Sequence, residues 1–155
     1  MTGFRLDRGG LVDRAAPLDF TFDGKKFTGF AGDTLASALI ANDVHLMGRS
    51  FKYHRPRGVI SAGSSEPNAL VELREGARKE ANTRATMIEL YDGLVARSQN
   101  RWPSLEFDIG ALGSIASAMF VAGFYYKTFM WPKSFWEKIY EPIIRRAAGL
   151  GVASK

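Results

Sequence analysis

Apolar and polar residues alternate near the start of the chain. Leu18–Phe22 reads apolar, polar, apolar, polar, apolar, which is the period of a strand with one buried face. The pair Asp23-Gly24 follows and predicts a tight hairpin turn, because glycine accepts the positive φ that such a turn needs. Phe27–Phe30 is then expected to return as the second strand of a hairpin.

A short helix is predicted directly after this hairpin. Asp33 or Thr34 can cap its free amide groups, and Leu35 and Leu39 recur on one helical face. The helix is expected to end at Asn42. The order strand, turn, strand, helix opens a β-grasp domain of the ferredoxin type, so the predicted fold class is α+β.

The rest of this β-grasp unit has a less regular sequence pattern. Residues 1–16 contain two adjacent glycines and charges without a period, and we expect them to form an N-terminal arm. Residues 48–68 hold glycine and proline at several positions and predict a long loop, which usually has a function or is held by a neighbour. Strands are predicted at Ala69–Leu73 and at Arg84–Leu90. The domain is therefore assigned to residues 17–93.

The pattern changes at Leu94. Residues 94–148 are predicted to be a helical extension, with a helix beginning near Asp108 and another over Ser134–Tyr140. Pro142 should break that helix or begin the next one, because proline suits a first helical turn and not an interior. Residues 149–155 contain glycines without a preceding strand and are expected to be a linker toward an absent dinucleotide-binding domain.

The extension is rich in aromatic residues. Eight of the 19 aromatic residues lie between Phe124 and Tyr140, and so short a segment cannot bury them alone. We expect it to pack on the β unit, on another domain or on another chain. Ile109–Tyr126 has no charge, but its apolar residues share one helical face. A packed amphipathic helix therefore explains it better than a membrane span does.

Composition excludes several kinds of site. The chain has no cysteine, which rules out disulfides, thiolate metal sites and cysteine-ligated iron–sulfur clusters built from its own residues. His45 and His54 are the two histidines, too few for a zinc site. We predict no metal ligands and no catalytic residues in this chain. The start is polar and charged, unlike a signal peptide, so the expected location is the cytoplasm.

Positive charge gathers in one loop. The net charge is +5, yet no acidic residue occurs between Val44 and Ser65. Cations that alternate with aromatic rings can hold a phosphate while a flat ring stacks, can bind single-stranded nucleic acid, or can meet an acidic protein surface. Glu66 beside Pro67 is expected only to close a turn. The candidate cofactor-binding or interface residues are Arg49, Lys52, Tyr53, His54, Arg55 and Arg57.

Several blocks in this order resemble one family. The chain resembles the alpha subunit of heterotetrameric sarcosine oxidase, in its N-terminal region, from about Leu18 to Gly151. The resemblance implies a complex of four different subunits that oxidises sarcosine to glycine. It also implies FAD, FMN, NAD and tetrahydrofolate in that complex, hydrogen peroxide as by-product, and a ferredoxin-like domain without its cluster. The blocks are Gly32–Leu39, Gly48–Gly58, Glu66–Val71, Asn100–Ser104, Gly123–Phe129 and Tyr140–Pro142.

This resemblance assigns the chain a supporting role. The family's NAD and folate sites are expected downstream of Lys155, and FMN, between the alpha and beta subunits, is assigned to no residue here. The chain would be a scaffold and docking portion, inactive by itself. Its partners would be the other alpha-subunit domains and the beta, gamma and delta subunits. The alternative is a small basic nucleic-acid-binding module that uses the Arg49–Arg57 loop.

Overall fold

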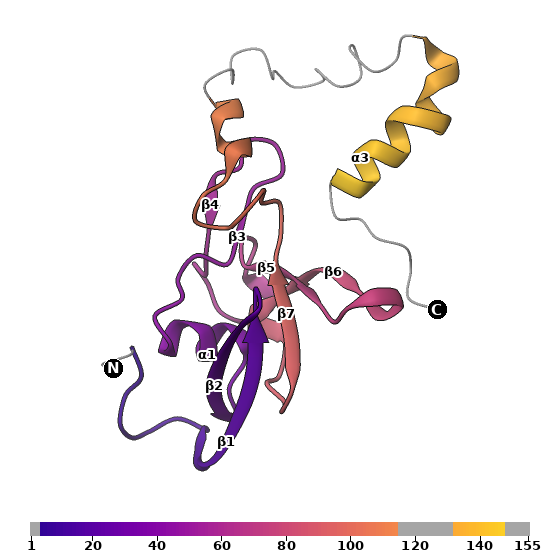
Figure 1. Ribbon diagram of the computed structural model, residues 1–155. Coiled ribbons are helices and arrows are strands. Elements are labelled where there is room, and N and C mark those ends of the chain that lie inside the picture. Colours follow the sequence, from indigo (N-terminus) through magenta and orange to yellow (C-terminus); the bar gives the residue numbers. More distant parts are fainter. Residues whose placement is uncertain (1–3, 115–131, 148–155) are drawn as a thin grey trace.

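The computed structural model of the chain describes residues 4–114 and 132–147 (Figure 1). A five-stranded mixed sheet forms its centre, in the order β2-β1-β7-β5-β6. β1 is parallel to β7, and the other neighbouring strands are antiparallel. The strands are β1 (Asp13–Phe22), β2 (Lys25–Ala31), β5 (Leu70–Leu73), β6 (Glu80–Arg84) and β7 (Leu94–Ser98).

The β1–β2 hairpin confirms the first two predicted strands and their turn. Phe22 pairs with Lys25 across the turn, and Asp23 and Gly24 adopt φ of 50° and 79°. The predicted arm 1–16 is too long, because β1 begins at Asp13. Pro17 hid this start, since a β-bulge between Asp13 and Pro17 accommodates a proline within the strand.

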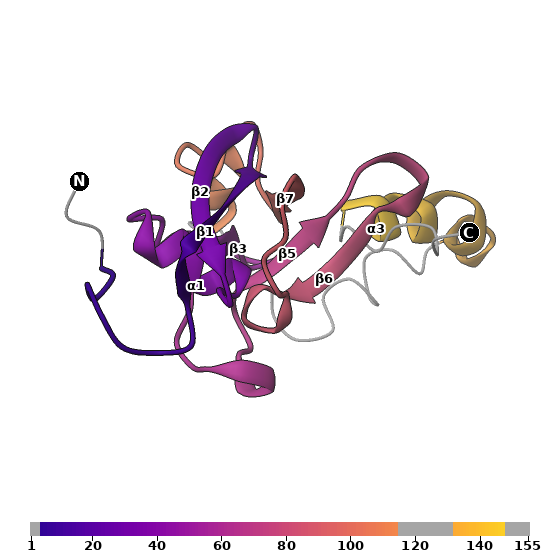
Figure 2. The same cartoon turned by 90° about the horizontal axis from the view of Figure 1, so that it is seen from below.

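Helix α1 (Leu35–Ala41) confirms the predicted helix and lies beside β1 and β2 (Figures 1 and 2). Thr34 is its N-cap: the Ser37 amide donates to Thr34 Oγ1 at 3.1 Å, and the Thr34 amide donates to Ser37 Oγ at 2.9 Å. Asn42 is the C-cap. Asp33 is buried just before the cap. Its carboxylate accepts hydrogen bonds from Nη1 and Nη2 of Arg5, at 3.1 and 2.6 Å, and these bonds attach the N-terminal arm to the domain.

Two predictions in the second half of the sheet are wrong. Arg84–Leu90 is not a strand: β6 ends at Arg84, and Ala85–Met87 is a 3₁₀ turn. The expected change to a helical extension at Leu94 does not occur either, because Leu94–Ser98 is β7, which joins β1 to β5. Parallel pairing with a strand about 75 residues earlier leaves no local sequence signal.

One hydrophobic core holds the sheet and α1 together. Leu35, Ala38 and Leu39 of α1 are fully buried against a cluster that includes Phe20 and Leu94. Each fully buried leucine or phenylalanine side chain contributes about 1.5–3 kcal/mol. A mixed sheet that pairs its first and last strands in parallel and packs one helix on a face agrees with the predicted α+β, β-grasp class.

The remaining elements lie outside this sheet. β3 (Gly48–Arg49) and β4 (Pro56–Arg57) form a two-stranded hairpin. Of the expected helix near Asp108, the described part is a 3₁₀ segment, Ile109–Ser114. Residues 115–131, with most of the charge-free stretch and the aromatic cluster, lie outside the described residues.

Helical structure resumes after residue 132. A 3₁₀ turn, Lys133–Phe135, leads into a π-helical turn, Trp136–Tyr140, and then into α3 (Glu141–Ala147). Pro142 occupies the first turn of α3, as predicted. Among the described residues, no helix combines the length and the apolar character that crossing a membrane requires. The predicted linker begins at residue 149, outside the described residues.

Candidate interface loop

The basic loop projects from the β3–β4 hairpin. Gly48 pairs with Arg57 and Arg49 with Pro56. The hairpin is closed by its own backbone, since the Ser50 amide donates to the Arg55 carbonyl oxygen at 2.9 Å. The loop therefore has a defined base, residues 48–49 and 56–57, and a tip, residues 50–55.

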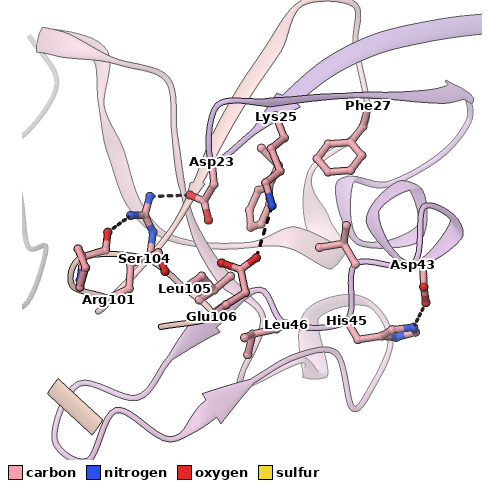
Figure 3. Close-up of a pocket in the computed structure, with 13 residues that line it drawn as sticks. Asp23, Lys25, Phe27, Asp43, His45, Leu46, Arg101, Ser104, Leu105 and Glu106 are labelled. Carbon is pink, nitrogen blue, oxygen red and sulfur yellow. Dashed lines mark hydrogen bonds and ion pairs between the residues drawn. The ribbon is translucent and has the colours of Figure 1, made fainter. Parts of the chain in front are cut away.

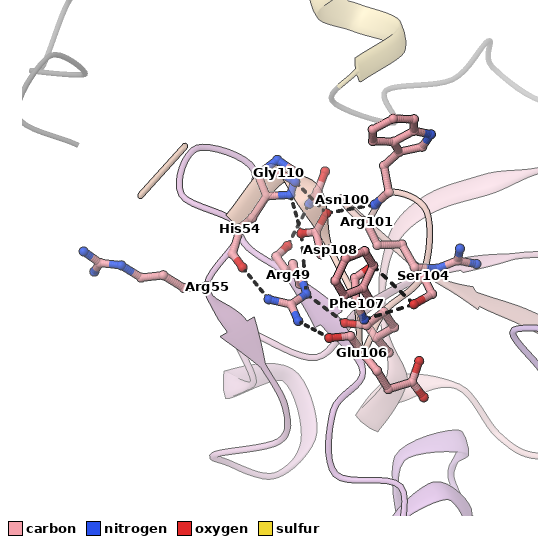
Figure 4. Close-up of polar contacts among 12 residues, drawn as sticks. Arg49, His54, Arg55, Asn100, Arg101, Ser104, Glu106, Phe107, Asp108 and Gly110 are labelled. Atoms are coloured by element: carbon pink, nitrogen blue, oxygen red, sulfur yellow. Dashed lines mark hydrogen bonds and ion pairs between the residues drawn. The ribbon is translucent and has the colours of Figure 1, made fainter. Parts of the chain in front are cut away.

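Arg49 lies inside the base and binds the protein itself. Its Nε donates to the Leu105 carbonyl oxygen at 2.9 Å, and Nη1 donates to the His54 carbonyl oxygen at 2.9 Å. Nη2 donates to the Glu106 carbonyl oxygen at 3.2 Å, and only 9% of the side chain is exposed. Arg49 thus joins the loop to residues 105–106 and has little capacity left for a ligand (Figure 4).

His54 and Asp108 form a second link to the same segment. His54 Nδ1 lies 2.6 Å from Asp108 Oδ2, and Asp108 Oδ2 is also 3.5 Å from Arg49 Nε. Burial by itself would raise the pKa of Asp108, but hydrogen bonds from the Trp102 amide, the His54 ring and the Gly110 amide lower it. Asp108 is therefore a buried carboxylate held in its charged form.

The space for the His54 ring comes from a glycine. A Cβ atom at Gly110 would lie 2.4 Å from His54 Nδ1 and Cε1, so any larger residue must displace the ring. His54 itself has φ of 51°, an uncommon value for a residue with a side chain. The ring is fixed by Asp108 on one side and by Gly110 on the other, which is a structural role.

Arg57 anchors the other strand of the base. Its Nη1 donates to Asn68 Oδ1. The amide of Asn68 in turn donates to Glu66 Oε1 at 2.6 Å, and the amides of Ile60, Ser61 and Ala69 donate to the same carboxylate. Burial would raise the pKa of Glu66, but these four amide donors lower it from 4.5 to about 2. Glu66 does close a turn, and it also organises the whole 60–69 segment.

Three of the candidate residues remain at the tip. Lys52 Nζ lies 5.0 Å from the centre of the Tyr53 ring, and Arg55 Cζ lies 4.9 Å from it. Such cation–ring contacts are worth about 0.5–1 kcal/mol each at exposed sites. Arg55 points away from the rest of the site in Figure 4, and the side chain of Phe51 is half-exposed.

The five charged candidates therefore separate into two groups. The side chains of Arg49, His54 and Arg57 are bound internally, while those of Lys52 and Arg55 contact the sixth candidate, the ring of Tyr53. The sequence analysis missed Asp108. Its carboxylate pairs with His54 and lies near Arg49, although it is 54 residues from His54 in the chain. A carboxylate that follows an aromatic residue in an irregular segment carries no signal of this pairing.

A separate open cleft of about 600 Å³ lies beside the β1–β2 hairpin (Figure 3). The 43–46 and 101–106 segments form its other walls. Its charged side chains already pair with one another: Lys25 Nζ is 3.5 Å from Glu106 Oε1, and Arg101 Nη2 is 2.8 Å from Asp23 Oδ1. No predicted site residue lines this cleft.

Comparison with known protein families gives a match over the sheet and the basic loop. Residues 15–101 match the family described as the 2Fe-2S iron-sulfur cluster binding domain. The match covers β1 to β7 and the basic loop. This chain belongs to that family. The ferredoxin-like fold predicted from the sequence is thereby confirmed.

The residues of this 2Fe-2S-type domain do not fit a cluster. Such clusters are held by cysteine thiolates, with histidine as an occasional substitute, and the chain has no cysteine. His54 Nδ1 is bound to Asp108, and His45 Nε2 is bound to Asp43 at 3.1 Å. Within the described ranges, no three potential metal ligands come together.

The curated relatives share one name. Over 154 residues, 99% of its length, this chain is 68% identical to the sarcosine oxidase subunit alpha of Rhizobium meliloti (strain 1021). It spans 16% of that protein's length. It is 42% identical over 93 residues to the subunit of the same name from Corynebacterium sp. (strain U-96), 57% of this chain and 9% of that protein. These relatives confirm the resemblance to sarcosine oxidase alpha subunits. Among solved structures, L-proline dehydrogenase from P. horikoshii matches with a TM-score of 0.44 and 25% identity, over 56% of this chain and 16% of that one.

Proposed function

We propose that this chain is the N-terminal scaffold and docking portion of a sarcosine oxidase alpha subunit. The observation that supports the proposal most is the 68% identity to the R. meliloti subunit over nearly the whole chain. The site supports it as well, because the histidine and two of the arginines of the basic loop hold the fold together.

The proposed reaction belongs to the whole complex, which we place in the cytoplasm. The N-methyl carbon of sarcosine is oxidised, glycine is released, and tetrahydrofolate takes up the one-carbon unit. The two electrons pass through flavin to oxygen and give hydrogen peroxide. FAD, FMN and NAD would be bound by parts of the complex outside this chain, and this domain would hold its remaining alpha-subunit domains and the beta, gamma and delta subunits in place.

The full-length alpha subunit, produced together with its partner subunits, tests this function. We expect peroxide that depends on sarcosine, and no assembled complex when residues 1–155 are deleted. The isolated chain should show neither flavin absorbance nor peroxide production. An assembled, active complex without these residues would contradict the scaffold role, and a complete complex without sarcosine-dependent peroxide would contradict the reaction.

The alternative, a nucleic-acid-binding module, is supported by the exposed Lys52 and Arg55 and by the partly buried Tyr53 ring between them. Single-strand binders combine several cations along a groove with stacking aromatic rings. Here Arg49 and Arg57 are bound to oxygen atoms of the protein, which leaves only two cations at the tip. Salt-dependent binding of single-stranded DNA that is lost on replacing Lys52 and Arg55 would favour this alternative.

A further inference from the structure

The exposed large apolar residues near the basic loop are unusual for a small domain. On the segment that Arg49 and His54 contact, Trp102 is 65% exposed, Phe107 70% and Leu112 63%. Phe51, at the loop tip, is 50% exposed. Exposed aromatic residues that gather at one end of a domain mark an interaction surface more often than single exposed residues do.

The tip and this segment form one rigid unit. Arg49 binds the carbonyl oxygens of residues 105 and 106, and His54 binds Asp108. The ring of His54 also lies against Gly110. These contacts of Arg49 and His54 therefore hold the tip, residues 50–55, and the apolar segment, residues 102–112, in a fixed relation. We refer to the exposed side chains of both together as the tip face.

The tip face has an unbalanced positive charge. No acidic residue lies between Val44 and Ser65, and the two carboxylates of the neighbouring segment are already occupied. Asp108 binds His54, and Glu106 pairs with Lys25. Within the part of the chain that the structure describes, Lys52 and Arg55 form no ion pair; their charged groups contact the Tyr53 ring.

We propose that the tip face docks onto a protein surface of the same oxidase assembly, and that this surface is apolar at its centre and acidic at its rim. The proposal rests on the proposed function. Tryptophan, phenylalanine and arginine are enriched at the centres of protein interfaces. Because charges across an interface are complementary, we expect carboxylates of the partner opposite Lys52 and Arg55. The chain spans 16% of the R. meliloti relative, so most of such a subunit lies outside it and can supply that surface.

A nucleotide fits these observations less well. A phosphate site needs donors that converge on one point, but Arg49 and Arg57 are bound to the protein, and Lys52 and Arg55 both contact a single ring. A bound base also needs a cavity, and the described cleft lies beside the β1–β2 hairpin, with none of the tip residues in its lining.

Hydroxyl-radical footprinting of the complete complex tests the proposal. After correction for intrinsic reactivity, we expect Trp102 and Phe107 to be protected about tenfold relative to the exposed Tyr91 and Met87, as for the centre of an interface. The double variant Lys52→Glu/Arg55→Glu should restore most of their reactivity. Lys26→Glu/Arg78→Glu, which changes the same charge at exposed positions elsewhere, should not. Equal reactivity of Trp102, Phe107 and Tyr91 would overturn the proposal.

Cross-linking identifies what covers the tip face. With Phe51→p-benzoylphenylalanine in the full-length complex, we expect a photoproduct joined to a residue outside positions 1–155, near carboxylates. A product joined to residues 113–131 would overturn the proposal, as would protection that disappears when bound nucleotide is removed. Sarcosine-dependent peroxide is measured on the same samples: peroxide without protection contradicts only this docking surface, and protection without peroxide contradicts only the proposed reaction.

Discussion

The base and the tip of the basic loop have similar residues and opposite roles. Arg49, at the base, donates to carbonyl oxygens and lies near the buried Asp108, and His54, at the end of the tip, binds the same carboxylate. At the tip, Lys52 and Arg55 contact only the face of Tyr53 among the described interactions of their charged groups. The cations differ in what the rest of the fold brings to them. Residue type alone therefore does not separate a cation that stabilises the fold from one that is available to a partner.

The comparison of the internally bound cations with those at the tip predicts the largest loss of stability for a substitution at Asp108. Asp108→Ala should lower the free energy of unfolding by about 3–5 kcal/mol, because Arg49 loses a charged partner inside the protein. The control is Asp43→Asn, since Asp43 also pairs with a histidine, at 3.1 Å, but is 75% exposed, and asparagine tolerates its φ of 63°. Urea unfolding measures both, and the control should change by about 0.5 kcal/mol or less. Equal effects would contradict the role of the buried Asp108 in holding Arg49 and His54.

The second prediction concerns the stability of the fold at acidic pH. It depends on Glu66, whose carboxylate holds the segment that binds Arg57. Its pKa is lowered from 4.5 to about 2, so its carboxylate stabilises the fold fully above about pH 4.5 and loses that effect as the pH falls toward 2. Glu66→Gln should be less stable near neutral pH, and its stability should change less than that of the wild type between about pH 5 and pH 2.5. Urea unfolding at several pH values measures this, with the exposed Glu106→Gln as the control.

A smaller effect is expected at Gly110. Gly110→Ala places a Cβ atom 2.4 Å from the His54 ring and should cost about 1–3 kcal/mol through overpacking. In a His54→Ala background the same change should cost clearly less, because the clash is gone. A double-mutant cycle of unfolding free energies checks this, and strict additivity would show that the His54 ring does not occupy this position.

The smallest effect on stability is predicted at the tip. Lys52→Ala and Arg55→Ala should each change the free energy of unfolding by about 0.5 kcal/mol or less, the range of ordinary surface substitutions. Arg49→Ala serves as the comparison at the base and should cost several times more. A tip variant as damaging as Arg49→Ala would mean that the tip, too, stabilises the fold, and would weaken the proposed docking surface.

Local patterns predicted the first third of the domain well. The alternation in Leu18–Phe22, the turn at Asp23-Gly24 and the cap at Thr34 act over a few residues, so the sequence shows them directly. The strand Leu94–Ser98 was missed, because its neighbours in the sheet, β1 and β5, are distant in the chain. The start of β1 was missed because a bulge allows Pro17 within the strand.

The sequence by itself determined the charge of the loop, the absence of cluster ligands and the resemblance to sarcosine oxidase alpha subunits, since these depend only on which residues are present and in what order. The tertiary structure decided which loop cations are occupied. Asp108, Leu105 and Glu106 lie more than 50 residues from Arg49 and His54, and only folding brings their oxygen atoms within hydrogen-bonding distance. A charged group that is buried without a partner costs free energy, so folding pairs it with polar groups from distant parts of the chain. An exposed charged group remains hydrated and can bind a partner.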